Sequence, residues 1–233
     1  GRKILAVVHH LLADLERDAA GWRYTWNPEL EGQEGKKYRP GDRACHFVEL
    51  LPHIKDDWRL SATRGARLLL EAWQVFVVCS TFGWVDRETG RRRFRVADLF
   101  VPRKNAKSTL AAAIGLYVGF VEGEHGAEVY SGATSEKQAG EVFKPAKLMT
   151  ERSPEFRERF GITVRSSNIS AEATNSRFEP VIGKPGDGAS PSCAIVDEYH
   201  EHPTEDLYDT MRTGMLARAQ PLMFVITTAG DDV

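Results

Sequence analysis

The sequence predicts an α/β fold: a three-layer sandwich with a mostly parallel central sheet and a helical extension at the N-terminus. Short apolar runs typical of buried strands recur along the chain, most clearly at residues 94–101, 192–198 and 221–226. Segments with apolar residues at helical spacing separate these runs, and strands that alternate with helices favour a parallel sheet. Polar residues follow each run, which is typical of strands whose carboxyl ends form a binding edge.

The expected elements follow one another from the N-terminus. Helical spacing predicts a helix over 4–19, and glycine, proline and charge predict an exposed connection over 21–42. Helices over 44–51 and 61–80 come next, then a hairpin over 82–94. Further along, we expect strands at 94–101, 127–132, 162–164, 177–182, 192–198 and 221–226, and helices at 110–118, 135–150, 156–160 and 204–217, the last capped by Thr204.

A phosphate-binding sequence lies at one strand-to-helix junction, Val101-Pro-Arg-Lys-Asn-Ala-Lys-Ser-Thr109. A helix N-terminus holds anions because its first N–H groups are unpaired and its dipole end is positive. Lys107 can add a charge on the β- and γ-phosphates, and Ser108 can place a hydroxyl on Mg²⁺. A Lys-Ser pair at an ordinary helix start is the alternative. The candidate nucleotide-binding residues of this loop are Pro102, Arg103, Lys104, Asn105, Ala106, Lys107, Ser108 and Thr109.

The loop departs from the usual P-loop pattern G-x-x-x-x-G-K-[ST] at both glycines. Val101 stands at the first glycine position and Ala106 at the second. Alanine tolerates a positive φ poorly. The loop must therefore avoid that conformation at Ala106 or accept some strain.

Two adjacent carboxylates, Asp197 and Glu198, end the apolar run 192–198. Four small or branched apolar residues before them predict a central strand that is buried on both faces. We expect Asp197 to hold Mg²⁺ opposite Ser108, and Glu198 to polarise the attacking water as a general base. The alternative is a strand that simply ends at two solvated acids.

A third strand end, after 221–226, carries Thr227 and Thr228. Hydroxyl groups there can contact the γ-phosphate or its attacking water. Three strand ends with these groups make phosphoryl transfer to water the leading interpretation. Gln74, on the expected helix 61–80, has an amide that matches the N6/N7 edge of adenine, although it could also face solvent.

Length, charge and composition limit the classes of protein to which this chain can belong. The 233 residues, 42% of them hydrophobic, suit one α/β domain with a small addition, so we expect a helical extension at 1–60 and a P-loop domain at 61–233. A net charge of -2 excludes a chain that is basic throughout, although the basic cluster of Arg91 to Arg93 and Arg95 could contact a phosphate backbone or end a solvated strand. The three cysteines are scattered and predict a reducing compartment. No apolar run approaches about 18 residues, so we expect no membrane span and no secretion.

In these ordered motifs the chain resembles the ATPase domain of a tailed-bacteriophage terminase large subunit, the DNA-packaging motor. The resemblance extends from about residue 68 onward. The segments that resemble it are Glu71-Ala-Trp-Gln74, Pro102-Arg-Lys-Asn-Ala-Lys-Ser108, Ser131-Gly-Ala-Thr134, Ile195-Val-Asp-Glu-Tyr-His-Glu-His202 and Arg218-Ala-Gln-Pro-Leu-Met-Phe-Val-Ile-Thr-Thr-Ala-Gly230.

The resemblance implies a P-loop NTPase fold of the RecA/ASCE-like kind, with ATP and Mg²⁺ as ligands. It implies that Gln74 approaches the adenine. It also implies that Arg103 acts on the phosphates in cis, beside the catalytic Lys107 and Glu198. The segment Thr227-Thr228-Ala229 would be the motif that couples hydrolysis to motion.

The resemblance further implies a homo-oligomeric ring, typically a pentamer on the portal protein, that feeds double-stranded DNA into a procapsid in the host cytoplasm. A small terminase subunit would be a further partner, and the nuclease domain expected after the ATPase is absent from this chain. Rings of this kind complete the site with an arginine from a neighbour. The candidates for it are Arg165, Arg177, Arg212 and Arg218.

Two alternatives stay open. Asp197-Glu-Tyr-His200 together with Gln74 would suit a DExH-type helicase-like ATPase, which needs a second RecA-like domain. A degenerate P-loop at Ala106 would suit a non-hydrolysing assembly module.

Overall fold

The computed structural model describes residues 2–32, 35–54, 67–133, 136–183, 188–199 and 204–228. The chain divides into two compact units, the first formed by 1–46 and 71–94 and the second by 47–70 and 95–233. The units interleave in sequence, because the chain leaves the first unit, returns to it and leaves it again. The boundary predicted at residue 60 falls outside the described ranges and stays a prediction.

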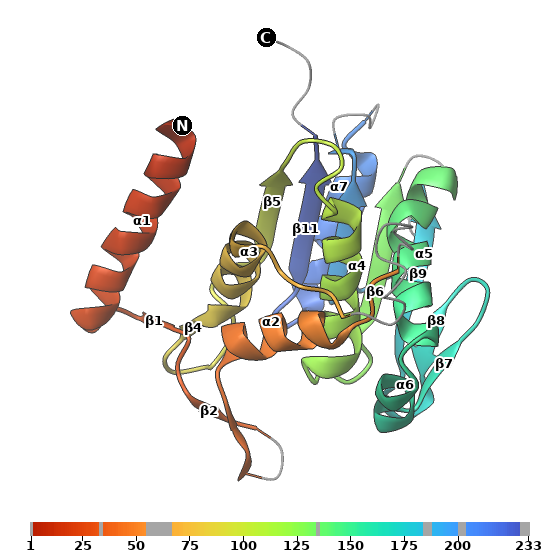
Figure 1. Ribbon diagram of the computed structural model, residues 1–233, viewed down its shortest axis with the longest axis horizontal. Helices are drawn as coiled ribbons and strands as arrows, with labels where there is room; N and C mark the ends of the chain where they lie inside the picture. The colour runs from red at the N-terminus through yellow and green to blue at the C-terminus, as the bar shows by residue number, and fades with distance from the viewer. Residues whose placement is uncertain are drawn as a thin grey trace. The chain divides into compact units, whose positions relative to one another are not determined.

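The second unit is built on a mostly parallel sheet, which confirms the predicted fold class. Its strands are β5 (Val96–Phe100), β6 (Glu128–Ala133), β7 (Ile162–Val164), β8 (Ile169–Ala171), β9 (Ser176–Ile182), β10 (Cys193–Asp197) and β11 (Leu222–Thr227). Seven strands lie in the order β5-β11-β10-β6-β9-β8-β7 in the described part of the chain (Figure 1). Neighbours from β5 to β9 in this order pair in parallel, whereas β8 and β7 are antiparallel.

The central strands β10 and β11 of the sheet are fully buried, whereas the edge strand β5 is largely exposed. All of β10 and β11 is buried, as the continuous apolar runs predicted. The prediction of a buried strand at 94–101 was wrong: β5 lies at the sheet edge, buries Leu99 and exposes Val96 and Phe100, the latter at 67%. An apolar run alone does not distinguish an edge strand from a central one.

Helices cover both faces of the sheet. They are α4 (Lys107–Leu116), α5 (Glu136–Glu151), α6 (Pro154–Phe160) and α7 (Asp206–Gly214). Figure 1 shows α4 on one face and α7 on the other. A Cβ at Gly115 of α4 would lie 2.8 Å from the Phe178 ring and 2.9 Å from Ile195, so only glycine lets this helix pack so close to the sheet. On the other face, Leu207 and Met211 of α7 join a buried cluster with Val196. The three-layer prediction is therefore confirmed.

Helix ends differ from the predictions by a few residues. The helix expected at 110–118 begins at Lys107 and continues as a π-helical turn over Tyr117–Val121. The last helix begins at Asp206 after the N-cap Glu205, so the predicted cap Thr204 was wrong.

The first unit combines helices with short strands. It contains α1 (Arg2–Ala19), β1 (Tyr24–Trp26), β2 (Leu30–Glu31), β3 (Lys37–Tyr38), the start of α2 (Pro40–Leu50), α3 (Ala72–Gly83) and β4 (Trp84–Asp86). The expected connection at 21–42 was thus wrong, because three short strands and the start of α2 lie there. The helix expected at 61–80 begins at Ala72: residues 67–71 are not helical, and 61–66 lie outside the described ranges.

The hairpin predicted over 82–94 is present around a turn that follows β4. Val85 bridges Arg92 in antiparallel fashion, and β4 also pairs with β1. Two members of the predicted basic cluster are part of the fold here. Arg92 is 5% exposed, and the Arg93 guanidinium lies 4.4 Å from the Trp22 ring and pairs with Asp14 at 2.7 Å.

Asp86 holds the turn of this hairpin. It accepts hydrogen bonds from the backbone N–H groups of Thr89 and Glu88, both at 3.0 Å, and from Arg23. The bond from Thr89, followed by that from Arg23, lowers the pKa of Asp86 to about 2. Because the unfolded value is about 3.9, this carboxylate stabilises the fold above pH 4, and the contribution is lost as pH falls through 2.

We therefore expect Asp86→Asn to lower the melting temperature at pH 7, because the amide accepts these bonds less strongly. The difference between variant and wild type should shrink as pH falls from 5 to 2, as circular dichroism melts at a series of pH values would detect. Glu88→Gln, an exposed acid in the same turn, is the control and should show no such convergence. A difference that stays constant with pH would contradict the role of the Asp86 charge.

Candidate nucleotide-binding site

The topology brings three polar segments to one edge of the sheet. β5, β11 and β10 are parallel neighbours, so their carboxyl ends lie side by side. The loop 101–106 follows β5, Asp197 ends β10, and Thr227 ends β11. The N–H of Val101 donates to the carbonyl oxygen of Thr227 at 3.2 Å, which extends the pairing into the loop.

Ala106 adopts a strained backbone conformation at the position where the usual P-loop pattern has its second glycine. Ala106 is the N-cap of α4 with φ 53° and ψ 25°, and Lys104 also has a positive φ of 69°. For an L-residue this left-handed conformation costs roughly 1–2 kcal/mol. The Asn105 side-chain amide donates to the carbonyl oxygens of Pro102, at 3.0 Å, and Arg103, at 3.3 Å, and so braces the turn.

The first residues of α4 meet the two carboxylates of β10. Lys107 is 8% exposed, and its Nζ lies 2.5 Å from Oε1 of Glu198. The Ser108 hydroxyl donates to Oδ2 of Asp197 at 3.3 Å. The structure therefore brings together the four side chains predicted to converge, although they are 89 to 91 residues apart in sequence.

Glu198 is held in an unusual backbone conformation. Its φ is 46°, in the left-handed region, and its N–H donates to Oδ1 of Asp197 at 2.8 Å. The N–H and hydroxyl groups of Thr228 each lie 3.4 Å from Oε2 of Glu198. Strained residues of this kind cost roughly 1–3 kcal/mol and cluster at functional sites.

The electrostatics of the site suit a cation. Burial, and then the charge of Glu198, raise the pKa of Asp197 to about 6, although Lys107 acts in the opposite direction. No group of three or more His, Cys, Asp or Glu side chains in the described ranges could hold a metal ion alone. Magnesium is instead held by one or two protein oxygens together with phosphate and water, a pattern that Ser108 and Asp197 fit.

The family described as the ATPase domain of the terminase large subunit matches residues 72–233. This chain belongs to that family. The match covers both the P-loop and the strand that ends in Asp197 and Glu198, so the resemblance seen in the sequence is confirmed.

A phage terminase, matched both in sequence and as a solved structure, and a bacterial protein are similar to this terminase ATPase domain. The terminase large subunit of Enterobacteria phage HK97 is 33% identical over 193 residues, which are 81% of this chain and 36% of that protein. The crystal structure of the HK97 bacteriophage large terminase matches with a TM-score of 0.65 and 27% identity, over 80% of this chain and 37% of that one. Protein YmfN of Escherichia coli strain K12 is 69% identical over 48 residues, 21% of this chain and 10% of its own length. The terminase ATPase domain described here thus spans about a third of the HK97 protein.

The described helices of this terminase ATPase domain include none that is both long and apolar enough to cross a membrane.

Outcomes differ among the other predicted site residues of the terminase ATPase domain. Gln74 belongs to the first unit and the P-loop to the second, so its approach to adenine stays a prediction. The alternative of a solvent-facing Gln74 was wrong: it is 8% exposed, and its Oε1 accepts a hydrogen bond from the N–H of Glu71 at 2.9 Å in a capping box. Arg103 is exposed on the loop. Ala229, Thr134 and residues 200–203 lie outside the described ranges.

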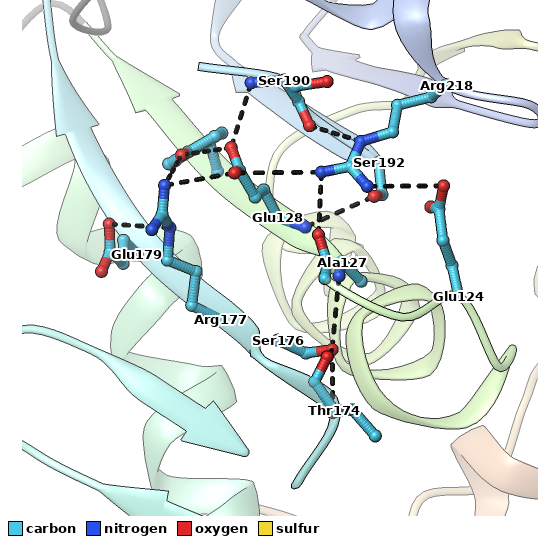
Figure 2. A network of polar contacts seen from close by, with 12 residues as sticks. Glu124, Ala127, Glu128, Thr174, Ser176, Arg177, Glu179, Ser190, Ser192 and Arg218 are labelled. Atoms are coloured by element: carbon cyan, nitrogen blue, oxygen red, sulfur yellow. Dashed lines mark hydrogen bonds and ion pairs between the residues drawn. The ribbon is translucent and has the colours of Figure 1, made fainter. Parts of the chain in front are cut away.

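A polar network that sequence reasoning missed involves two of the four candidate arginines (Figure 2). Oε1 of Glu128 lies 3.3 Å from Arg177 and 3.8 Å from Arg218. Oε2 of Glu128 accepts hydrogen bonds from the Tyr130 hydroxyl at 2.8 Å and the Ser190 N–H at 3.0 Å. Arg218 also donates to the carbonyl oxygen of Ser190 at 2.7 Å.

This network lies at the amino end of the parallel strands. Glu128 is the first residue of β6, whereas the P-loop and Asp197 lie at the carboxyl ends. Arg177 and Arg218 are therefore engaged at the edge opposite to the candidate nucleotide-binding site. Of the other two candidates, Arg165 donates to the Ser170 hydroxyl at 2.9 Å, and Arg212 is exposed on α7. No local sequence signal could have revealed the network, because Glu128 and Arg218 are far apart in the chain.

The left-handed conformation of Ala106 can be tested by a substitution that relieves its strain. We expect Ala106→Gly to leave stability unchanged or to raise it by up to about 1 kcal/mol, because relief of the left-handed strain exceeds the added entropy of the unfolded chain. Urea unfolding would measure it. Ala139→Gly, at a buried helical position of the same unit, is the control and should destabilise by about 1–2 kcal/mol. A loss of more than 1 kcal/mol at Ala106 would show that the alanine methyl group is needed where it is.

Proposed function

We propose that this chain is the ATP-hydrolysing motor domain of a DNA-packaging terminase, which couples Mg²⁺-dependent ATP hydrolysis to translocation of double-stranded DNA into a procapsid. The observation that supports this most is the meeting of Lys107 and Ser108 with Asp197 and Glu198 at one edge of a parallel sheet. A cation, a hydroxyl and two carboxylates in this arrangement are the parts that phosphoryl transfer to water requires.

In this proposal the start of α4 binds the triphosphate. The first N–H groups of a helix point along its axis without intrahelical partners, so they can bind phosphate oxygens. Lys107 is buried at this point and adds a full charge at low dielectric. Arg103 extends from the exposed loop and would act on the phosphates in cis. Ser108 and Asp197 would hold Mg²⁺, which when bound neutralises charge on the β- and γ-phosphate oxygens.

Glu198 is the proposed general base. Its carboxylate is oriented from two sides, by Lys107 at one oxygen and by Thr228 at the other. A carboxylate fixed in this way can accept a proton from an attacking water once the phosphate draws the Lys107 ammonium toward itself. Lys107 would then serve both binding and catalysis.

β11 gives the proposed coupling route. This strand lies between β5 and β10, so Thr227 and Thr228 sit between the loop and Glu198. A change in the carboxylate of Glu198 reaches Thr228 directly, through the N–H and hydroxyl groups that contact Oε2. We propose that Thr227, Thr228 and Ala229 transmit hydrolysis to the DNA-moving parts by this contact.

The partners remain proposals from the family. The HK97 relative is a terminase large subunit of which this chain spans about a third. We propose that this chain works in the host cytoplasm as a homo-oligomeric ring on a portal protein, with a small terminase subunit and a nuclease domain as further parts. A neighbour's arginine would complete each site. Arg212, exposed on α7, is the better candidate, because Arg177 and Arg218 belong to the network around Glu128 and Arg165 donates to Ser170.

The role of Glu198 predicts a separation of binding from turnover. Glu198→Gln should lower the ATPase rate by roughly 10²–10⁴-fold, because the amide cannot accept the proton. ATP-Mg²⁺ affinity measured by calorimetry should change little. Glu141→Gln, an exposed acid on α5, is the matched control and should keep the wild-type rate.

Turnover by Glu198→Gln equal to wild type would exclude Glu198 as the base. Absence of any heat with ATP-Mg²⁺ in the wild-type chain would favour the non-hydrolysing assembly module instead.

Thr228 predicts a graded effect on the same reaction. Thr228→Val keeps the side-chain shape and removes the hydroxyl that contacts Glu198, so the ATPase rate should fall roughly 10–100-fold, the value of one hydrogen bond to a charged group. Thr228→Ser should retain most of the rate. Equal rates for the valine and serine variants would mean that the hydroxyl does not position the carboxylate.

A further inference from the structure

Two thiols lie side by side in the first unit. Cys45 is on α2, and Cys79 is on α3. Their sulfur atoms are 3.4 Å apart, and both side chains are half-buried. The pair lies outside the loop, strands and carboxylates of the proposed ATPase site, and nothing in that function uses it.

The backbones that carry these thiols also approach closely. A Cβ built on Gly41, one helical turn before Cys45, would lie 3.4 Å from the Cα of Cys79. The Cys45 sulfur lies 4.0 Å from the carbonyl oxygen of Val75, one turn before Cys79. The two helices are therefore in contact over a full turn. A disulfide needs its sulfur atoms about 2.05 Å apart, a small movement for side chains on backbones this close.

We propose that Cys45 and Cys79 are a reversible oxidation site, a dithiol pair that peroxide converts to a disulfide between α2 and α3. The Cys79 thiolate attacks one oxygen of hydrogen peroxide, which forms a sulfenic acid and releases the other oxygen as water after protonation. The Cys45 sulfur then attacks the sulfenic sulfur, forms the S–S bond and releases a second water. Two thiols are oxidised by two electrons, and one peroxide is reduced to two waters.

The surroundings distinguish this pair from the third cysteine. The hydrogen bond from Cys45 lowers the pKa of Cys79, although burial and the charge of Asp42 act in the opposite direction. Cys193 lies in the central strand β10 with 0% exposure. Oxidation follows thiolate character and access, so Cys193 serves as an internal reference.

A disulfide at these two positions should stabilise the fold, because of where the two cysteines lie in the chain. The chain passes from the first unit to the second after His46 and returns at Glu71. Cys45 and Cys79 flank these two crossings, so an S–S bond would close a loop that contains all of 47–70. Closure of a loop of this length restricts the unfolded chain and stabilises the fold.

Peroxide treatment of the folded chain tests the proposal. After brief exposure to hydrogen peroxide, the thiol titre of the denatured protein should fall from three to one, and peptide mapping without reductant should find Cys45 joined to Cys79. Dithiothreitol should restore all three thiols. The oxidised protein should melt several degrees above the reduced protein. Cys193→Ser should give the same cross-link, whereas Cys45→Ser and Cys79→Ser should give none and show no rise in melting temperature.

Phenylarsine oxide gives a second measurement that does not depend on oxidation. It should bridge the two thiols in wild type and in Cys193→Ser, but bind weakly to either single variant of the pair. The proposal is overturned if the main product is a disulfide between chains, or if Cys193 is oxidised as fast as Cys79. It is also overturned if Cys79 reaches the sulfenic acid without joining Cys45.

Discussion

The parallel pairing of β5, β11 and β10 is the constraint on which the rest of the site depends. It places the P-loop, Thr227 and Asp197 at one edge, although these segments are distant in sequence. The register fixes which side chain faces α4: a shift of β10 by one residue would turn Asp197 away from Ser108 and toward α7. Close packing of α4 against the sheet at Gly115, together with the buried apolar residues of β10, stabilises that register.

Charge balance follows from this geometry. Two adjacent carboxylates and one ammonium group meet in a largely buried region, where Lys107 compensates Glu198 directly and burial raises the pKa of Asp197 to about 6. At Asp197 the effects of burial and of the neighbouring Glu198 charge outweigh that of Lys107. This balance supports the proposal that Mg²⁺ binds beside Asp197 together with a nucleotide phosphate.

The sequence predicted the parts of this architecture that local patterns encode. The apolar run before Asp197 and the strand-to-helix junction at Lys107-Ser108 were recognised because each is encoded in consecutive residues, although the helix begins three residues before the expected position. The edge position of β5 was missed, because Phe100 is apolar and yet exposed. Burial of Gln74 was missed because its capping box pairs it with Glu71, an uncommon N-cap. The Glu128 network joins residues from separate strands and loops, so it could not be predicted from composition or from the periodicity of apolar residues.

The left-handed backbone of Glu198 favours glycine at this position, whereas the proposed chemistry needs a carboxylate there. Glycine would relax the turn but remove the carboxylate, and a β-branched residue would lose the carboxylate and worsen the strain. Under the proposed role of Glu198 as general base, a selection for thermal tolerance alone would favour inactive variants at this position, whereas a selection for turnover would retain the less stable glutamate. Improvement of such a domain has to come from residues away from this turn.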